Sequence, residues 1–357
     1  MESLFPFGFP FATGLYLTFY VVTLTLHVVF MNYVLTGTAY LAFTRKPPES
    51  PELRIRPVLA SWMPLMLSGA ITAGIAPLLF VQILYKQSFY TANLLLFNRW
   101  MSILPALILG FYALYLAQSG WLTRRPHWLR VAVAALPFAC VAYTGYSWTE
   151  NHLLSLETPE YWGKFYGAEE WRYYEPQLIP RLLVWAFGAM PVFALVVAWQ
   201  LFYRSRGGEV IMAGVERTLS FLALAGLALA GASAVTYWSL SDFSSGRVRA
   251  MAGPYFVAAV VGCVIQAAGW LRFRFERRRL FALTAGTALT VLGMTATREA
   301  IRLDAFGPDR IEPLMRLHED AANVGGIGAF LVFFVLNAGL ITLCVLIVRN
   351  GRKQPGD

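Results

Sequence analysis

The sequence predicts an all-α polytopic membrane protein with about nine transmembrane helices. Hydrophobic residues make up 57% of its 357 residues and charged residues only 14%, whereas a soluble domain carries about 25% charge. Apolar segments of membrane-spanning length alternate with Pro, Gly or charge clusters. We expect them to form one integral membrane domain over residues 1–357, with helices at about 13–44, 58–85, 100–121, 129–149, 181–203, 218–240, 251–271, 280–297 and 325–348.

The basic residues predict the orientation. The loops after the first, third, fifth and seventh segments, with the C-terminal tail, carry 18 of 29 Lys and Arg residues but 6 of 20 acidic ones, a net charge of +12. The opposite side has a net charge of −3. By the positive-inside rule, the N-terminus lies outside and the C-terminus in the cytoplasm of a bacterial inner membrane. This topology and contact with lipid explain the overall charge of +9 without nucleic acid.

The first segment holds His27, the one histidine of four that lies well inside an apolar run. Arg45, 18 positions later, marks an interface, and at ~1.5 Å per residue the two lie roughly 27 Å apart. We therefore expect His27 near the extracytoplasmic surface. It is a candidate ligand of haem iron, or a hydrogen-bond partner of a quinone. The alternative is a neutral imidazole satisfied by a Tyr, a Thr or a backbone group of the bundle.

The longest predicted loop, 150–180, lies on the outer side and is both acidic and aromatic. An interfacial aromatic belt is its default explanation. A lid over the helix ends is one alternative. A docking surface for another subunit, such as a basic cytochrome steered by the carboxylates, is another.

A second outer stretch, 297–320, begins with Arg298 and Arg302, about one helical turn apart. It reads as a solvated, ion-paired loop. The alternative is that these arginines neutralise a haem propionate, or that His318 and neighbouring acids handle protons. No charged residue falls at the middle of a predicted segment, which disfavours a proton-driven transporter. Three separated cysteines without a CxxC or CxxCH spacing predict no covalently attached haem.

Three stretches carry a resemblance to a known family. His27-Val-Val-Phe30 precedes LTGTAYLA, Ala73-Gly74 lies in a Gly-rich second segment, and Trp148 closes the fourth. These features resemble the N-terminal part of subunit I of cytochrome bd-type quinol oxidases, over about the first 150 residues. The resemblance implies nine helices, an outer N-terminus and a haem-ligating histidine in the first helix near the outer face.

The chain also departs from that family. The fifth segment lacks the second haem-ligating histidine, the third lacks the family's glutamate, and the Gly-Arg-Gln-Pro-Trp motif is missing. The link where the family has its quinol-binding loop is only about ten residues, SDFSSGRVRA. The resemblance therefore implies at most one b-type haem, at His27. Its second ligand would be absent, or come from His152, Met294 or another subunit. Oxygen reduction by this chain alone is not expected.

These observations lead to one functional hypothesis and two alternatives. The chain is expected to be an integral subunit of a bacterial respiratory electron-transfer complex. It would be a quinol-linked oxidoreductase subunit that exchanges electrons between membrane quinol and an extracytoplasmic cytochrome partner. The first alternative is a non-catalytic scaffold that anchors redox subunits. The second is a transporter or channel.

Overall fold

The structure, a computed structural model, describes residues 8–44, 52–206, 214–241, 246–324 and 326–351. In these ranges it contains helices and turns but no strand. The helices are α1 (Phe11–Phe43), α2 (Glu52–Leu84), α3 (Lys86–Leu95), α4 (Phe97–Met101), α5 (Ile103–Gln118), α6 (Gly120–Thr123), α7 (His127–Leu154), α8 (Pro159–Gly167), α9 (Leu178–Arg206), α10 (Val215–Leu240), α11 (Gly246–Leu271), α12 (Arg277–Asn323) and α13 (Gly326–Gly351).

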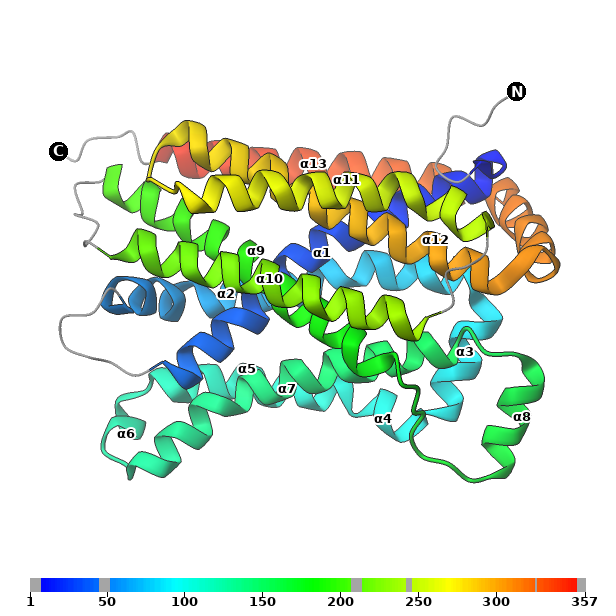
Figure 1. Ribbon diagram of the computed structural model, residues 1–357, viewed down its shortest axis with the longest axis horizontal. Helices are drawn as coiled ribbons and strands as arrows, with labels where there is room; N and C mark the ends of the chain where they lie inside the picture. Colours follow the sequence, from blue (N-terminus) through cyan, green and yellow to red (C-terminus); the bar gives the residue numbers. More distant parts are fainter. Residues whose placement is uncertain (1–7, 45–51, 207–213, 242–245, 325, 352–357) are drawn as a thin grey trace.

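The long helices run back and forth along one axis (Figure 1). Eight helices in the described ranges are long and apolar enough to cross a membrane. They coincide with the first eight predicted segments, which confirms the all-α polytopic class. The ninth segment forms α13, and its crossing of the membrane stays a prediction. We call the two ends of the bundle the α6 end, at the left of Figure 1, and the α8 end, at the right.

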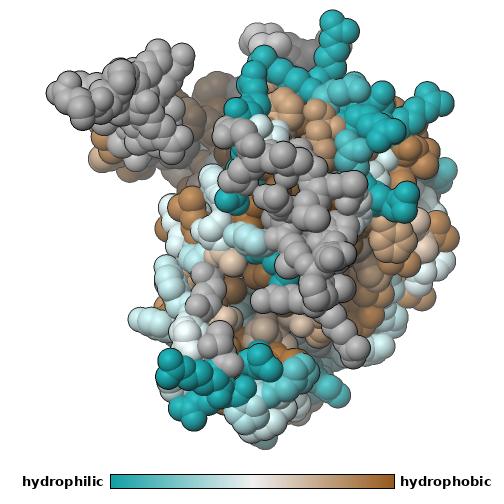
Figure 2. Space-filling view, turned by 90° about the vertical axis from the view of Figure 1, so that its left-hand side faces the viewer, coloured by the Kyte–Doolittle hydropathy of each residue, from teal (hydrophilic) through white to brown (hydrophobic). Residues whose placement is uncertain are grey.

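Positive charge collects at the α6 end. The turn between α5 and α7 exposes Arg124 and Arg125, and the turn between α11 and α12 exposes Arg272 and Arg274. Figure 2 looks onto this end, where hydrophilic residues gather at the rim and hydrophobic residues cover the flanks. At the same end, the side chain of Arg56 donates to the carbonyl oxygens of Thr44 (3.0 Å) and Leu41 (3.1 Å). It thereby satisfies carbonyls that the end of α1 leaves unpaired.

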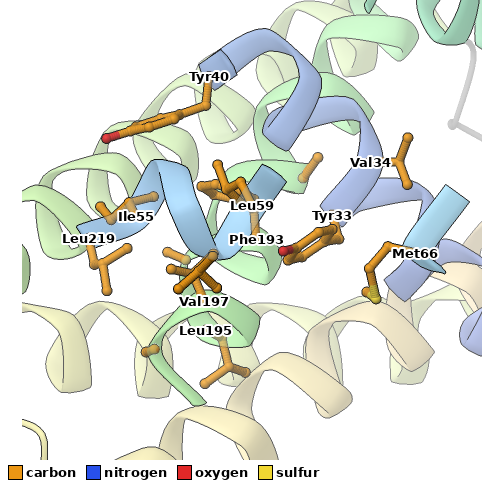
Figure 3. Packing of buried hydrophobic residues seen from close by; sticks show 14 of the residues in the cluster. Tyr33, Val34, Tyr40, Ile55, Leu59, Met66, Phe193, Leu195, Val197 and Leu219 are labelled. Carbon is orange, nitrogen blue, oxygen red and sulfur yellow. The ribbon is translucent and has the colours of Figure 1, made fainter. Parts of the chain in front are cut away.

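The main apolar core lies where α1, α2, α9 and α10 meet (Figure 3). Phe193 is fully buried there, with its ring centroid 5.7 Å from that of Tyr33 and 6.0 Å from that of Tyr40. Two polar pairs cross this core, where hydrocarbon offers no water as a partner. The hydroxyl of Tyr33 donates to Gln200 (3.1 Å), and the indole of Trp185 donates to Asn32 (2.9 Å).

The outer stretches differ from the predicted loops. α7 continues to Leu154 and α8 follows within 150–180, so this segment is partly helical. α12 does not end at 297 but runs on to a kink at Gly307 (φ 68°, ψ 170°), beyond which it continues to Asn323. Only glycine adopts that conformation readily. The predicted segments end just before the first charged residue, whereas several of these charged residues are buried inside the bundle.

Small residues bring α11 and α12 together. A Cβ added at Gly262 would lie 2.6 Å from the carbonyl oxygen of Gly286, and one at Gly293 would lie 2.6 Å from that of Tyr255. Backbone atoms cannot move aside as side-chain tips do. The two helices therefore pack at a distance that only glycine allows, as in many membrane helix pairs.

Gly262→Ala should destabilise the protein, although alanine normally favours a helix. The expected cost is about 1–3 kcal/mol, because the added methyl group overpacks the α11–α12 contact. Gly253→Ala in the same helix is the control, since nothing lies within 4 Å of its added Cβ. Thermal unfolding in detergent should show a lower Tm for the first variant only. Equal Tm values would contradict the close contact.

Candidate functional site

The α8 end of the bundle encloses a buried group of polar side chains. We call it the Arg302 cluster, and it comprises Tyr85 from the junction of α2 and α3, His152 of α7, and Glu299 and Arg302 of α12. None of the four is more than 4% exposed, and Glu299 is 0% exposed. Glu299 and Arg302 lie three residues apart, so their side chains share one face of α12. Apolar residues around the cluster include Leu17, Val21, Phe80, Leu303 and Phe306.

The members of the cluster bind one another. The hydroxyl of Tyr85 donates to Oε1 of Glu299, and Nη1 of Arg302 lies 3.7 Å from Oε2 of Glu299. The Arg302 guanidinium lies 4.6 Å from the Tyr85 ring centroid, and its Nη2 donates to Nδ1 of His152. Because a guanidinium only donates, Nδ1 must accept. His152 is therefore a neutral imidazole with its proton on Nε2.

A second buried ion pair lies beside the cluster. Nε of Arg99, on α4, is 2.8 Å from Oε2 of Glu150, on α7, whose side chain is 0% exposed. Oε1 of Glu150 accepts the backbone N–H of Tyr173 at 2.8 Å. The Arg99 guanidinium also lies 5.5 Å from the ring centroid of Trp171. This pair ties α4 and α7 to the segment that follows α7.

That segment, residues 155–177 including α8, packs against α3 and the end of α7 at the α8 end, and we call it the lid (Figure 1). Trp162 and Phe165 are buried, and the indole of Trp162 donates to the carbonyl oxygen of Leu154 at 2.8 Å. Tyr166, Trp171 and Tyr174 are instead 70–77% exposed. A lid function for this segment stays a prediction. Contact of the exposed rings with a partner or with lipid stays a prediction.

His27 lies at the middle of α1, sixteen residues from either end. Its expected depth near the outer surface stays a prediction. Nδ1 lies 2.9 Å from the carbonyl oxygen of Ala70, on α2, and must donate to it. The ring rests against Gly74, where an added Cβ would lie 2.9 Å from its Cε1. Nε2 has no hydrogen-bond partner among the described residues. A backbone-bound Nδ1–H with an available Nε2 is the usual state of a metal-ligating histidine.

The other candidate haem ligands differ in availability. Nδ1 of His152 already accepts from Arg302, and Nε2 carries a proton, so ligation would require this contact to break. Met294 is half-buried in α12, eight residues before Arg302. Tyr20 of α1 interacts with Arg302 and precedes His27 by seven residues. α1 and α12 run in opposite directions and meet at this contact. His27 lies seven residues further along α1 and Met294 eight residues back along α12, so the two lie at a similar depth. Among the described residues, no group of three or more His, Cys, Asp or Glu side chains could hold a metal ion.

The propionate candidates and His318 also have defined places. Arg302 belongs to the cluster, and half-buried Arg298 lies within electrostatic range of His152. His318 is 3% exposed rather than solvated. Its Nε2 donates to the carbonyl oxygen of Leu84 (3.2 Å), and its Nδ1 accepts from the hydroxyl of Thr13 (3.0 Å). His318 therefore joins three helices, and both its nitrogens are used.

Four residues of the site were not predicted: Tyr85, Arg99 and Glu299 had no assigned role, and Glu150 was expected in a loop. A signal for Glu299 was present, because Arg298, Glu299 and Arg302 directly continue an apolar helical segment at one-turn spacing. Tyr85 and Arg99 gave no local signal. Only the tertiary fold brings them to their carboxylate partners.

Comparisons with known proteins give no relative for this site. No protein-family model matches the chain, and no match was found among curated proteins or solved structures.

Arg302→Met should lower the free energy of unfolding by about 3–5 kcal/mol, because it leaves the buried Glu299 carboxylate without its cation. The double variant Glu299→Leu/Arg302→Met should regain most of that loss, since it removes both charges. Denaturant unfolding of the three proteins in detergent measures both differences. A single variant as stable as the wild type would show that the pair is not buried as described.

The lid should respond to pH through Glu175. The Tyr173 hydroxyl lies 2.7 Å from Oε1 of Glu157 and 3.1 Å from Oε2 of Glu175, and one phenol proton cannot fully serve two carboxylates. Burial first, and then Glu157, raise the pKa of Glu175 above its ordinary value of 4.5, although Tyr173 and Arg181 oppose this. The stability that Glu175 contributes is thus complete below pH 4.5 and is lost as pH rises through the raised pKa.

Hydrogen exchange of the lid amides, corrected for intrinsic rates, measures this effect. Protection in the wild type should fall as pH rises from 4.5 to neutral. Glu175→Gln should retain its protection at neutral pH, because its side chain stays uncharged. Glu170→Gln, an exposed position in the same segment, should behave as the wild type. A pH response that persists in Glu175→Gln would rule out this carboxyl as its source.

Proposed function

We propose that this chain is an integral subunit of a bacterial respiratory electron-transfer complex, which exchanges electrons between membrane quinol and an extracytoplasmic cytochrome. The observation that carries the proposal is the Arg302 cluster, with a carboxylate, a guanidinium, a phenol and a neutral imidazole buried in an apolar bundle. Ionisable groups at such positions are costly and usually serve ion, proton or substrate pathways.

The cluster offers what quinol oxidation needs from a protein. Oxidation of a quinol releases two electrons and two protons, so a base must take each proton. Glu299 is a carboxylate that already accepts a proton donor, the hydroxyl of Tyr85. His152 is neutral and donates through Nε2. Glu299 can therefore receive one quinol proton and, after passing it on, the second. The Nε2–H of His152 can donate a hydrogen bond to a quinol oxygen, while the two electrons pass to the cytochrome partner.

The proposed orientation places the α8 end outside and the α6 end in the cytoplasm. The exposed arginines at the turns of the α6 end support it by the positive-inside rule. The lid and its exposed aromatic residues would then face an extracytoplasmic partner. Protons from quinol would leave on the outer side, close to the Arg302 cluster.

One b-type haem at His27 is part of the proposal. With its available Nε2 and backbone-bound Nδ1, His27 would hold the haem iron, and Met294 lies at a similar depth on α12. When bound, such a haem would supply a one-electron carrier between quinol and the cytochrome. Within the chain, Ala70 orients the imidazole and Gly74 makes room for it.

Two alternatives have support of their own. The use of both nitrogens of His318 in helix contacts favours a scaffold, in which polar groups only hold helices together. Burial of Glu299 and Arg302 favours a transporter more than the sequence did, because charge does lie inside the bundle. Solute uptake into proteoliposomes without a redox partner would indicate transport, and normal quinol turnover by a complex whose chain lacks the cluster would indicate a scaffold.

Glu299→Gln tests the central role of the cluster. Quinol-dependent reduction of the cytochrome partner by the purified complex should fall about 100-fold, the lower end of what a positioned acid or base contributes. Glu312→Gln, at an exposed ion pair of the same helix, should keep wild-type turnover. Unchanged turnover in Glu299→Gln would exclude Glu299 as the proton acceptor.

His27→Ala tests the haem separately. The purified wild-type protein should show a Soret band and a pyridine haemochrome of b type, and His27→Ala should lose both. His127→Ala, at the exposed start of α7, is the matched control and should retain them. A colourless wild-type protein, or a Soret band that survives in His27→Ala, would contradict ligation by His27.

A further inference from the structure

Three arginines gather at the α8 end around one neutral histidine. Arg181 lies in the first turn of α9, and Arg298 and Arg302 lie one turn apart on α12. All three are within electrostatic range of His152. Arg181 is likewise within range of both Arg298 and Arg302. The three arginines thus lie at the α8 end where α7, α9 and α12 meet, with Arg302 in direct contact with His152.

Negative charge in this region does not balance them. Glu299 neutralises Arg302 alone. Glu175 is close enough to attract Arg181, but its raised pKa weakens that attraction. No carboxylate of the described residues forms an ion pair with Arg298. Like charges repel strongly where water is scarce, so this grouping is unfavourable without a further anion.

Hydrogen bonding is incomplete in the same place. Nε and Nη1 of Arg302 are buried without a hydrogen bond of normal length, although Nη1 faces Oε2 of Glu299 at 3.7 Å and Tyr20 lies against the guanidinium. Buried donors of this kind are rare in native proteins and call for a specific partner. Arg181 and Arg298 are only half-buried, so a ligand can approach them. The region therefore combines surplus positive charge, an incompletely bonded Arg302 guanidinium, and access through Arg181 and Arg298.

We propose that this region binds a phosphate group, with Arg181, Arg298 and Arg302 as its ligands. Each guanidinium presents paired N–H donors that match phosphate oxygens, and phosphate is a partner that arginine clusters favour. The phosphate is either a free inorganic ion or the headgroup of an anionic phospholipid at the membrane surface. This binding goes beyond the proposed function, since it requires neither quinol nor electron transfer.

Thermal unfolding of the purified protein in a neutral detergent tests the proposal. Inorganic phosphate replaces chloride at constant ionic strength in one arm. Phosphatidylglycerol is compared with diacylglycerol, which lacks phosphate, in the other. A ligand that binds only the folded state raises Tm as its concentration increases. Arg298→Gln is the test variant, and Arg316→Gln, at an exposed ion pair of the same helix, is the control.

The wild type and Arg316→Gln should gain Tm with phosphate or with phosphatidylglycerol, and Arg298→Gln should lose that gain. In chloride, without phosphate or phosphatidylglycerol, Arg298→Gln should melt higher than the wild type, because one repelling charge is gone. A response to inorganic phosphate identifies the free ion, and a response to phosphatidylglycerol alone identifies the lipid headgroup. An equal gain in Arg298→Gln, or no gain in the wild type with either ligand, would overturn the proposal.

Discussion

The burial of a charged guanidinium in an apolar bundle is the constraint on which the other features depend. Arg302 cannot be hydrated at 4% exposure, so its guanidinium must be held by Glu299, Tyr85 and His152. These partners come from α12, from the α2–α3 junction and from α7. The contacts of this one guanidinium therefore fix where three separate parts of the chain lie relative to one another.

Buried imidazole nitrogens also need hydrogen-bond partners, and the histidines differ in how many of their nitrogens are used. His318 uses both nitrogens to join α1, α2 and α12, and His152 uses Nδ1 to accept from Arg302. His27 uses only Nδ1, in a bond to the backbone of α2. Its Nε2 lone pair remains available. Among these three buried or half-buried imidazoles, His27 is thus the one whose bonding leaves a position for a metal.

The sequence predicted the membrane class and the first eight spans well, because a long apolar run is a local signal. It failed where the fold overrides hydropathy. The predicted spans end at residues 149 and 297, just before Glu150 and Arg298, yet Glu150 and Glu299 are fully buried and each is paired with an arginine. The pairing of Arg99 with Glu150 joins residues far apart in the chain, which no local pattern encodes. The depth of His27 also depended on which end of a 33-residue helix extends beyond the membrane.

The most direct test of the account is the redox-induced infrared difference spectrum of the complex in liposomes that contain its quinone. If Glu299 receives a proton from quinol, oxidation should produce a C=O stretching band of a protonated carboxyl group. That band should be present in Glu312→Gln and absent in Glu299→Gln. A spectrum without a carboxyl band, or one identical in the two variants, would show that the Arg302 cluster takes no part in quinol chemistry.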